Sequence, residues 1–401
     1  MKPSIPTWVI LAILVGYFAI GQFHRAAGSV TTPLLIERLT VGATAISLVM
    51  AIMFFASVVT QLPMGAALDK IGARTTMALT TLCVALGTAV FAIADDYTQF
   101  LLARVLMGIG FAAGGAATNV IIARAFPARD FAYTQGRVVA FGAIGGLMGT
   151  YPLAVSLERA PWSVVFLVLT VLTVVLALAI YRLVPKAPEK TADSVMETGG
   201  YLELLKSTEM LKIMTLAIVA YAPIVVITGL WGSAYFQEIH GLRPEAAGGL
   251  IFAFYGATIV GAFGFGWLER RTAQRKRLIL AAAFGSATCF SALALVPNMG
   301  VVLTGVTFVV MVTFQQFHVA LSAHLRAVVP AAKLGRGSAL FSLVAVVAIP
   351  SMQLGFGAVL DLAELAGLSR ELGYRIGFGL VGLIVIGTTL VYATARQANE
   401  T

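Results

Sequence analysis

The sequence predicts an all-α membrane protein with twelve transmembrane helices, six in each half of the chain. Apolar side chains make up 59% of the 401 residues and charged ones only 11%, whereas soluble domains are roughly half apolar and about a quarter charged. Twelve apolar runs approach or exceed the roughly 20 residues that a helix needs to cross a bilayer. The longest hydrophilic stretch separates six of these runs from the other six.

The twelve spans are expected near residues 8–36, 43–65, 75–94, 99–123, 134–156, 161–184, 211–235, 245–268, 277–296, 300–325, 336–360 and 374–396. The first run begins after Lys2 and continues without a small-residue cleavage site, so we expect a retained helix and not a signal peptide. The hydrophilic stretch contains prolines, a glycine pair and mixed charges, which is typical of a linker. We therefore expect an N-terminal bundle (1–184), a cytoplasmic linker (185–210) and a C-terminal bundle (211–401).

The basic residues predict how the chain is oriented. With a cytoplasmic N-terminus, twenty of the 27 lysines and arginines fall on the cytoplasmic side and five on the outer side. This bias follows the positive-inside rule and predicts that both termini are cytoplasmic. The net charge of +9 is thereby explained by topology, and nucleic acid is not an expected partner.

Several other classes of function lack their sequence signals. Cys83 and Cys289 both lie in apolar runs, so neither a disulfide framework nor a cysteine metal site is expected. The sequence has no phosphate-binding loop of the kind that primary pumps require. The short loops contain no cluster of catalytic residue types, so we expect neither an enzyme nor a cofactor.

Two spaced motifs resemble the signatures of the major facilitator superfamily. The second run ends in the pattern Gly-x-x-x-Asp-Lys-x-Gly followed by an arginine (Gly65, Asp69, Lys70, Gly72, Arg74). The fourth run carries Arg104 followed by glycines at 108, 110 and 114. Because the number of runs and the central linker also match, the resemblance covers essentially the whole chain.

The resemblance implies two six-helix bundles around a central cavity that opens alternately to either side of the membrane. It also implies a gating role for Asp69, Lys70 and Arg74. Glu269 and Arg270 follow 200 residues after Asp69 and Lys70, and we expect a weaker version of that role there because the glycine spacing differs. A monomer in the inner membrane of a bacterium is the expected setting.

A finer resemblance concerns the first run, which carries His24 and Arg25. An arginine in the first helix is similar to organic-anion symporters and to a broad nitrate-like bacterial group. The fifth run lacks the Gly-Pro-x-x-Gly-Gly pattern of drug–proton antiporters, which disfavours drug export without excluding it. The second half has no arginine in the middle of a run, which disfavours nitrate itself.

Charges inside the bilayer are costly, at least about 2.5–3.5 kcal/mol each, and should face a wet cavity or a partner. Acidic residues cluster at the ends of the runs, so Arg25 has no fixed counter-ion nearby in sequence. A substrate carboxylate can supply one through paired hydrogen bonds; snorkelling of Arg25 to the interface is the alternative. Arg104 lies near the start of its run, and both a structural and a proton-coupling role stay open for it.

Isolated polar and aromatic residues in the runs predict the remaining lining of a substrate cavity. Gln315, His318 and Ser322 share one helical face at i, i+3 and i+7. Hydrogen bonding between helices, or an interfacial belt for the aromatic residues, are the alternatives. The expected substrate-binding residues are Arg25, His24, Asn119, Trp231, Tyr235, Gln315, His318 and Gln353. The candidates for coupling to protons are His24, Arg104 and His318, since histidine titrates near neutral pH.

The leading functional hypothesis is therefore secondary transport of a small organic anion, by proton symport or by anion exchange. Efflux of drugs or other amphiphilic solutes is the alternative within transport. Met210 and Met214, at i and i+4, leave metal import as a weaker alternative, although such a pair usually only packs.

Overall fold

The computed structural model describes residues 5–185, 204, 206–272, 274–329 and 334–396. All secondary-structure elements within these ranges are helical, and they include twelve helical spans that are long and apolar enough to cross a membrane. The predicted all-α membrane fold is therefore confirmed. Most of the predicted linker, residues 185–210, lies outside the described residues.

Contacts between residues divide the chain into two compact units. The N-terminal unit consists of Met1–Thr40 and Leu48–Ser194, and the C-terminal unit of Val41–Ser47 and Val195–Thr401. The first turn of the second helix thus groups with the C-terminal unit. There the Asp361 carboxylate accepts hydrogen bonds from the backbone N–H groups of Ala43 at 2.7 Å and Thr44 at 2.8 Å. A carboxylate satisfies amides at a helix N-terminus and complements the helix dipole.

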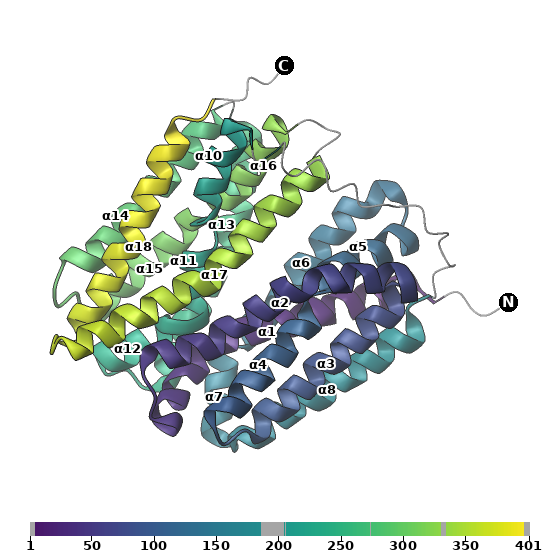
Figure 1. Cartoon of the computed structure of the whole chain (residues 1–401), viewed down its shortest axis with the longest axis horizontal. Helices are drawn as coiled ribbons and strands as arrows, with labels where there is room; N and C mark the ends of the chain where they lie inside the picture. Colours follow the sequence, from purple (N-terminus) through teal and green to yellow (C-terminus); the bar gives the residue numbers. More distant parts are fainter. Residues whose placement is uncertain (1–4, 186–203, 205, 273, 330–333, 397–401) are drawn as a thin grey trace. The chain divides into compact units, whose positions relative to one another are not determined.

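The N-terminal unit (purple to teal in Figure 1) is built from the first six spans. Its helices are α1 (Thr7–Leu39), α2 (Ala43–Ile71), α3 (Ala73–Ile93), α4 (Tyr97–Phe111), α5 (Gly114–Ala125), the short 3₁₀ turn Ala128–Asp130, α6 (Phe131–Met148), α7 (Tyr151–Arg159) and α8 (Trp162–Leu183). α3 packs along α4 and α8, and α1 packs along α6. Glycines permit these close approaches: the Cα atoms of Gly87 and Gly145 face backbone atoms of the neighbouring helix.

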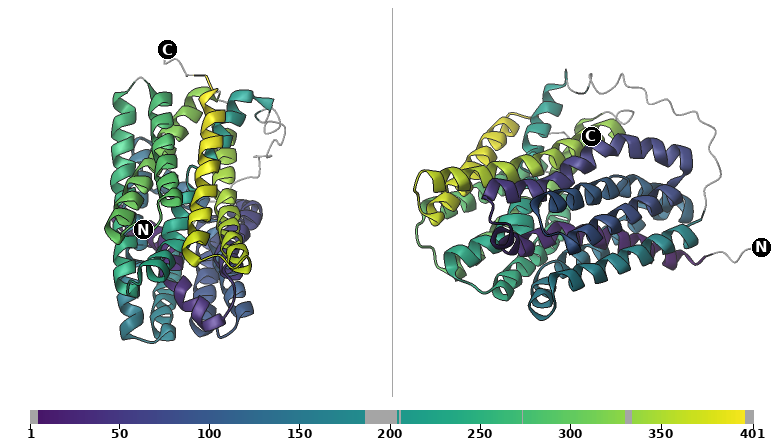
Figure 2. Two further views of the ribbon diagram at one scale, coloured as in Figure 1. Left: turned by 90° about the vertical axis from the view of Figure 1, so that its left-hand side faces the viewer. Right: turned by 60° about the horizontal axis from the view of Figure 1, so that its bottom comes forward.

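The C-terminal unit forms a second bundle, whose green and yellow helices are seen along their length in the left view of Figure 2. Its helices are α10 (Thr208–Ala217), α11 (Ala222–Val226), the π-helical segment Ile227–Trp231, α12 (Gly232–His240), α13 (Pro244–Arg271), α14 (Arg275–Leu295), α15 (Val301–Phe314), the 3₁₀ turn Gln315–Phe317, α16 (His318–Val328), α17 (Leu334–Leu365) and α18 (Arg370–Ala393). α14 packs along α18, and α13 packs along α15.

Four spans are interrupted, which the sequence patterns did not predict. The fourth span breaks at residues 112–113, the fifth at 149–150 and the tenth at Gln315–Phe317. The seventh breaks at residues 218–221 and then continues through the π-helical segment Ile227–Trp231. The fourth and tenth spans occupy corresponding places in the two halves. Discontinuous helices at corresponding positions mark binding regions in transporters.

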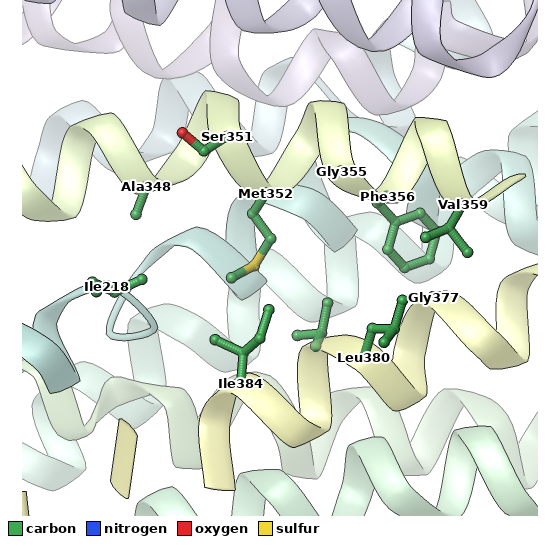
Figure 3. A pocket seen from close by; sticks show the side chains of 11 residues that line it. Ile218, Ala348, Ser351, Met352, Gly355, Phe356, Val359, Gly377, Leu380 and Ile384 are labelled. Atoms are coloured by element: carbon green, nitrogen blue, oxygen red, sulfur yellow. The ribbon is translucent and has the colours of Figure 1, made fainter. Parts of the chain in front are cut away.

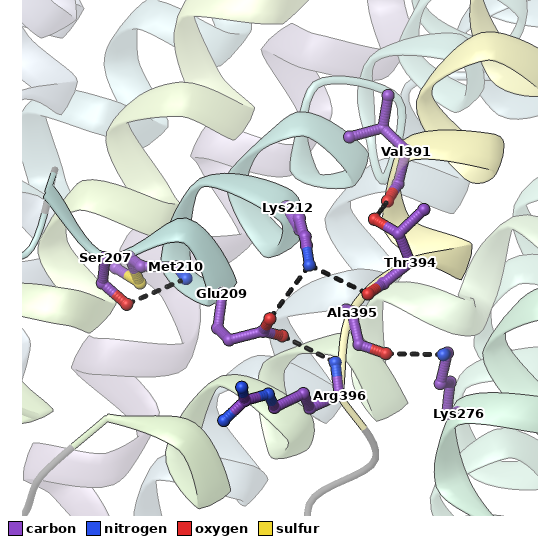
Figure 4. A network of polar contacts seen from close by, with 9 residues as sticks. All are labelled: Ser207, Glu209, Met210, Lys212, Lys276, Val391, Thr394, Ala395 and Arg396. Carbon is purple, nitrogen blue, oxygen red and sulfur yellow. Dashed lines mark hydrogen bonds and ion pairs between the residues drawn. The ribbon is translucent and has the colours of Figure 1, made fainter.

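The ion pairs among the described residues lie at or just beyond helix ends, as the cost of charge in hydrocarbon requires. Arg38 pairs with Asp95 at 2.5 Å and Arg370 with Glu238 at 2.6 Å. At the end predicted to be cytoplasmic, Lys212 and Glu209 hold the residues that follow α18 (Figure 4): the ammonium group donates to the Thr394 carbonyl at 2.9 Å, and the carboxylate accepts from the Arg396 N–H at 2.6 Å. Cations near the last carbonyls of a helix stabilise its C-terminus.

Gly145→Ala should destabilise the N-terminal unit, because the added Cβ would overlap the Ala19 carbonyl oxygen of α1. Overpacking of this kind costs about 1–3 kcal/mol. We expect a lower thermal unfolding midpoint for the purified protein. The matched control is Gly136→Ala on the same helix, where the added Cβ meets open space; equal midpoints for the two variants would contradict the packing described for α1 and α6.

Candidate functional site

His24 and Arg25 are neighbours in α1 but lie in different surroundings. His24 is only 2% exposed; its Nε2 lies 3.2 Å from the Thr88 hydroxyl, and its ring packs near that of Phe111. Arg25 is partly exposed, and its guanidinium donates to the Gln22 amide oxygen at 3.1 Å. Within the described ranges Arg25 forms no ion pair. Arg25 is therefore partly accessible and has no counter-ion in the described part of the chain, whereas His24 is enclosed.

Arg104 is enclosed within the N-terminal unit, 2% exposed. Its guanidinium donates to the His24 carbonyl at 3.3 Å and to the Met50 sulfur at 3.0 Å, and it lies 4.7 Å from the centroid of the Phe91 ring. Among the described residues no carboxylate pairs with it. A carbonyl, a thioether and an aromatic face therefore stabilise this charge. The surroundings are those of a residue that joins four helices, α1 to α4.

Asn119 and the break in the fourth span lie close together in sequence. Asn119 is exposed on α5, which begins at Gly114 after the break. The Tyr17 hydroxyl donates to the Gly110 carbonyl at 3.2 Å, and a Cβ at Gly114 would overlap the Tyr17 ring. Tyr17 thus supplies a hydrogen-bond donor to a backbone carbonyl next to the break. Such a partner is needed in a membrane, where no water is present to replace it. The sequence signal for this contact was the glycine at position 114, whose partner could not be predicted.

The breaks in the seventh and tenth spans meet in the C-terminal unit. The rings of Tyr221 and His318, one from each break, lie edge to face with centroids 5.9 Å apart. Both side chains are half-buried. Gln315 lies one turn before His318, is fully buried, and donates to the Ser286 hydroxyl at 2.7 Å. Its Oε1 and the Nδ1 of His318 have no hydrogen-bond partner among the described residues. Sequence reasoning predicted Gln315 and His318 but missed Tyr221.

Trp231, Tyr235 and Gln353 lie inside the packed C-terminal unit. Trp231 is fully buried and stacks on Phe356, with ring centroids 6.2 Å apart. Tyr235 is 5% exposed and packs against Tyr374 in a cluster of aromatic rings. The Gln353 Oε1 and the Trp231 Nε1 are buried without a partner in the described chain. A substrate role for these three residues remains a prediction.

The predicted gating residues lie at the ends of helices rather than in open loops. Asp69 and Lys70 are exposed on the last turn of α2. Gly72 then turns the chain with φ +82°, a conformation that explains the glycine in the motif, and the Arg74 guanidinium lies 5.2 Å from the centroid of the Tyr181 ring.

The related pair in the second half, Glu269 and Arg270, is described only in part. Glu269 pairs with Arg275 at 2.6 Å. The side chain of Arg270 lies outside the described residues.

A separate apolar pocket of about 270 Å³ lies between α17, α18 and the break in the seventh span (Figure 3). Its lining includes Met352, Phe356 and Ile384, and the hydroxyl of Ser351 is its one polar side-chain group among the described residues. A carboxylate would lose its hydration there without compensation. The pocket therefore suits an apolar group and not an anion.

Residues 13–352 match the family model of the major facilitator superfamily. The chain belongs to the major facilitator superfamily. Solved members share its fold: a bacterial homologue of the human lysosomal transporter Spinster has a TM-score of 0.78 at 15% identity, covering 100% of this chain and 98% of that one. A D-xylose–proton symporter has a TM-score of 0.78 at 14% identity, covering 98% and 99%.

Curated relatives of this superfamily member differ in what they carry. The hexuronate transporter of Bacillus subtilis (strain 168) is 24% identical over 330 residues, 79% of this chain and 77% of the relative. A probable L-galactonate transporter of Escherichia coli (strain K12) is 29% identical over 174 residues, 43% and 38% of the two chains. The multidrug transporter MdfA of Edwardsiella piscicida is 24% identical over 226 residues, 53% of each. These three relatives are all named as transporters, which fits a multi-pass membrane protein.

Arg104→Lys should destabilise this member of the major facilitator superfamily although it retains the charge. The ammonium cannot reproduce the planar contact with Phe91 together with hydrogen bonds to Met50 and the His24 carbonyl. We expect a thermal unfolding midpoint several degrees below wild type, measured in detergent. Arg38→Lys, at an exposed ion pair, is the control and should change the midpoint little. An Arg104→Lys variant as stable as wild type would rule out the proposed packing role.

Proposed function

We propose that this secondary transporter carries a small organic anion across the membrane by alternating access, with Arg25 contacting the carboxylate. The observation that carries the proposal is the contrast between the two arginines inside the N-terminal unit. Arg104 is enclosed by protein groups, whereas Arg25 is accessible and has only the neutral Gln22 as a hydrogen-bond partner among the described residues. A guanidinium in that position favours a bidentate oxyanion.

The relatives support the anionic class for this chain. Hexuronate and L-galactonate, named for two of them, both carry one carboxylate. Asn119, Gln315, His318 and the remaining predicted binding residues complete the proposed substrate contacts. We propose import by proton symport or by anion exchange. Transport measured with and without an imposed pH gradient distinguishes these two mechanisms.

For proton coupling we favour His318 over His24 and Arg104. His318 is half-buried at a helix break, whereas the other two are 2% exposed inside the N-terminal unit. A proton carrier must exchange its proton with the aqueous phase during the cycle, and an enclosed side chain cannot do so without rearrangement. We further propose a monomer in the bacterial inner membrane, with both termini cytoplasmic as the positive-inside rule indicates.

Arg25→Ala should abolish binding of carboxylates without unfolding the protein. A ligand that binds only the folded state adds about 2.7 kcal/mol of stability at a hundredfold excess over its Kd. We expect galacturonate or another small carboxylate to raise the unfolding midpoint of wild type and not that of the variant. Arg38→Ala removes a partly exposed arginine with an acidic partner and should retain the response. Carboxylate binding that is retained in Arg25→Ala would contradict the proposal.

Efflux of amphiphilic solutes is the second candidate function, favoured by the apolar pocket in Figure 3 and by the MdfA relative. Efflux predicts that lipophilic cations raise the thermal unfolding midpoint of the protein, and that they still do so in Arg25→Ala. The effect should be lost in Met352→Trp, whose bulkier side chain would fill the pocket. The described spans carry no carboxylate away from their ends to hold such a cation, so we place this candidate second.

For gating we propose that Asp69, Lys70 and Arg74 act together at the end of α2, with Glu269 and Arg270 in a lesser role. Asp69→Asn should therefore slow transport in liposomes by tenfold or more while changing ligand affinity less than twofold, because a gate alters the rate of conformational exchange and not the binding groups. Glu269→Gln is the comparison and should slow transport less. Unchanged transport in Asp69→Asn would remove this residue from the gate.

A further inference from the structure

The apolar pocket in Figure 3 belongs to the C-terminal unit alone and lies at mid-height of its spans. Its lining comes from residues 348–359 of α17, residues 377–384 of α18 and Ile218, which directly follows α10. The first two stretches lie near the centres of their helices. The centre of a membrane-spanning helix lies at the depth of the lipid tails, so the pocket is a feature of the hydrocarbon layer.

The mouth of the pocket is formed by the lining residues that are exposed. Leu380 and Ile384 are 44% and 45% exposed, and Ile218 is exposed although its neighbours in the seventh span are buried. Next to them on α18, the exposed side chains of Ile376 and Leu383 are also apolar. Lipid tails are as apolar as these side chains. The mouth is therefore continuous with a surface of the kind that contacts lipid tails in the bilayer.

The pocket offers an occupant no polar anchor among the described residues. The hydroxyl of Ser351 donates to the Val347 carbonyl at 3.0 Å and is thus already satisfied within α17. Sites for drug-sized solutes measure about 300–1,000 Å³ and carry a few placed polar groups that orient the ligand. This pocket is smaller, at about 270 Å³. Its size and lining suit part of a hydrocarbon chain better than a whole solute.

Two glycines shape the pocket. An added Cβ at Gly355 would meet no atom within 4 Å, so this residue leaves space beside α17. At Gly377 an added Cβ would overlap the Phe356 ring, so this glycine allows the ring to lie against α18. Phe356 in turn stacks on Trp231, the last residue of the π-helical segment. The wall of the pocket thus contacts both irregular parts of the seventh span, because Ile218 lies at the break.

We infer that this pocket binds the hydrocarbon tail of a membrane lipid, beside the interrupted seventh span. Apolar cavities do not hold water, because a water molecule needs two or more polar partners. A lipid tail would gain dispersion contacts with the wall and would leave no polar group without a partner. The inference goes beyond the proposed function, since the ligand is a membrane lipid and not a transported solute. It also gives the pocket a different ligand from the one that the efflux candidate requires.

Trp231 can report on the occupant, because it is fully buried and stacks on a ring that lines the pocket. The chain has four tryptophans, and replacing Trp8, Trp162 and Trp267 by phenylalanine leaves Trp231 alone. This single-tryptophan full chain is reconstituted in phosphatidylcholine with bromine at the middle of its tails, and separately in the same lipid without bromine. Bromine quenches tryptophan fluorescence at close approach. We expect the brominated lipid to lower the Trp231 fluorescence by about half.

Gly355→Leu in this single-tryptophan protein would fill the pocket and should restore most of the fluorescence in brominated lipid. Gly264→Leu is the matched control. It adds the same side chain at a helical glycine with open space, on α13 and outside the pocket lining, and should leave the quenching unchanged. Ile384→Phe narrows the mouth at an exposed position and should also reduce the quenching. This second variant keeps the test valid where Gly355→Leu fails to fold.

Three results would overturn the inference. The first is equal quenching in the single-tryptophan protein and in its folded pocket variants. The second is no quenching of Trp231 in brominated lipid. The third is relief of the quenching by tetraphenylphosphonium, a lipophilic cation, because displacement of the tail by this cation would assign the pocket to a transported solute.

Discussion

Hydrocarbon offers no hydrogen-bond partner to the backbone, and this constraint governs where the helices of the protein can be interrupted. Within a membrane, irregular backbone is tolerated only where protein covers it or where it lines a water-filled cavity. Tyr17 covers the end of α4 by packing against Gly114 and donating to Gly110, whereas the break in the seventh span leaves Tyr221 accessible. The break in the fourth span is therefore covered by protein, whereas the break in the seventh span leaves a polar side chain partly exposed.

The same constraint explains why the two arginines in the apolar runs of the N-terminal half have different surroundings. Both lie in apolar runs without acidic neighbours, and both cost free energy unless something replaces water. For Arg104 the protein itself takes the place of water, through the Phe91 ring, the Met50 sulfur and the His24 carbonyl. Arg25 has one hydrogen bond, to Gln22, and a ring contact with Phe54 at 6.0 Å within the described chain. The difference depends on which helices lie opposite each residue, which is tertiary information.

Much of the fold could be predicted from the sequence because span length is a local property. The twelve spans, and the motif ending at Gly72, required only hydrophobicity and spacing. Polar residues such as Gln315 and His318 could also be found, since isolated polar side chains stand out in apolar runs. Tyr221 could not, because a tyrosine in an aromatic-rich chain gives no signal until its exposure is known. Nor could the buried positions of Trp231 and Tyr235 be predicted, because the π-helical segment Ile227–Trp231 departs from the α-helical spacing that sequence patterns assume.

The lack of a counter-ion at Arg25 within the described chain makes the empty and the loaded carrier electrically different. In the proposed site, a bound monocarboxylate cancels the arginine charge, and the loaded protein changes its access without moving net charge at this site. The empty protein returns with the charge uncompensated. The membrane potential contributes about 2.3 kcal/mol per elementary charge for each 100 mV. The barrier of the return step therefore changes with voltage, in proportion to the fraction of the membrane field that the Arg25 charge crosses. A return rate in liposomes that does not change with an imposed potential would exclude this voltage dependence. In the proposed import cycle, an inside-negative potential therefore opposes the outward return of the empty carrier, the step that follows release of the substrate into the cytoplasm.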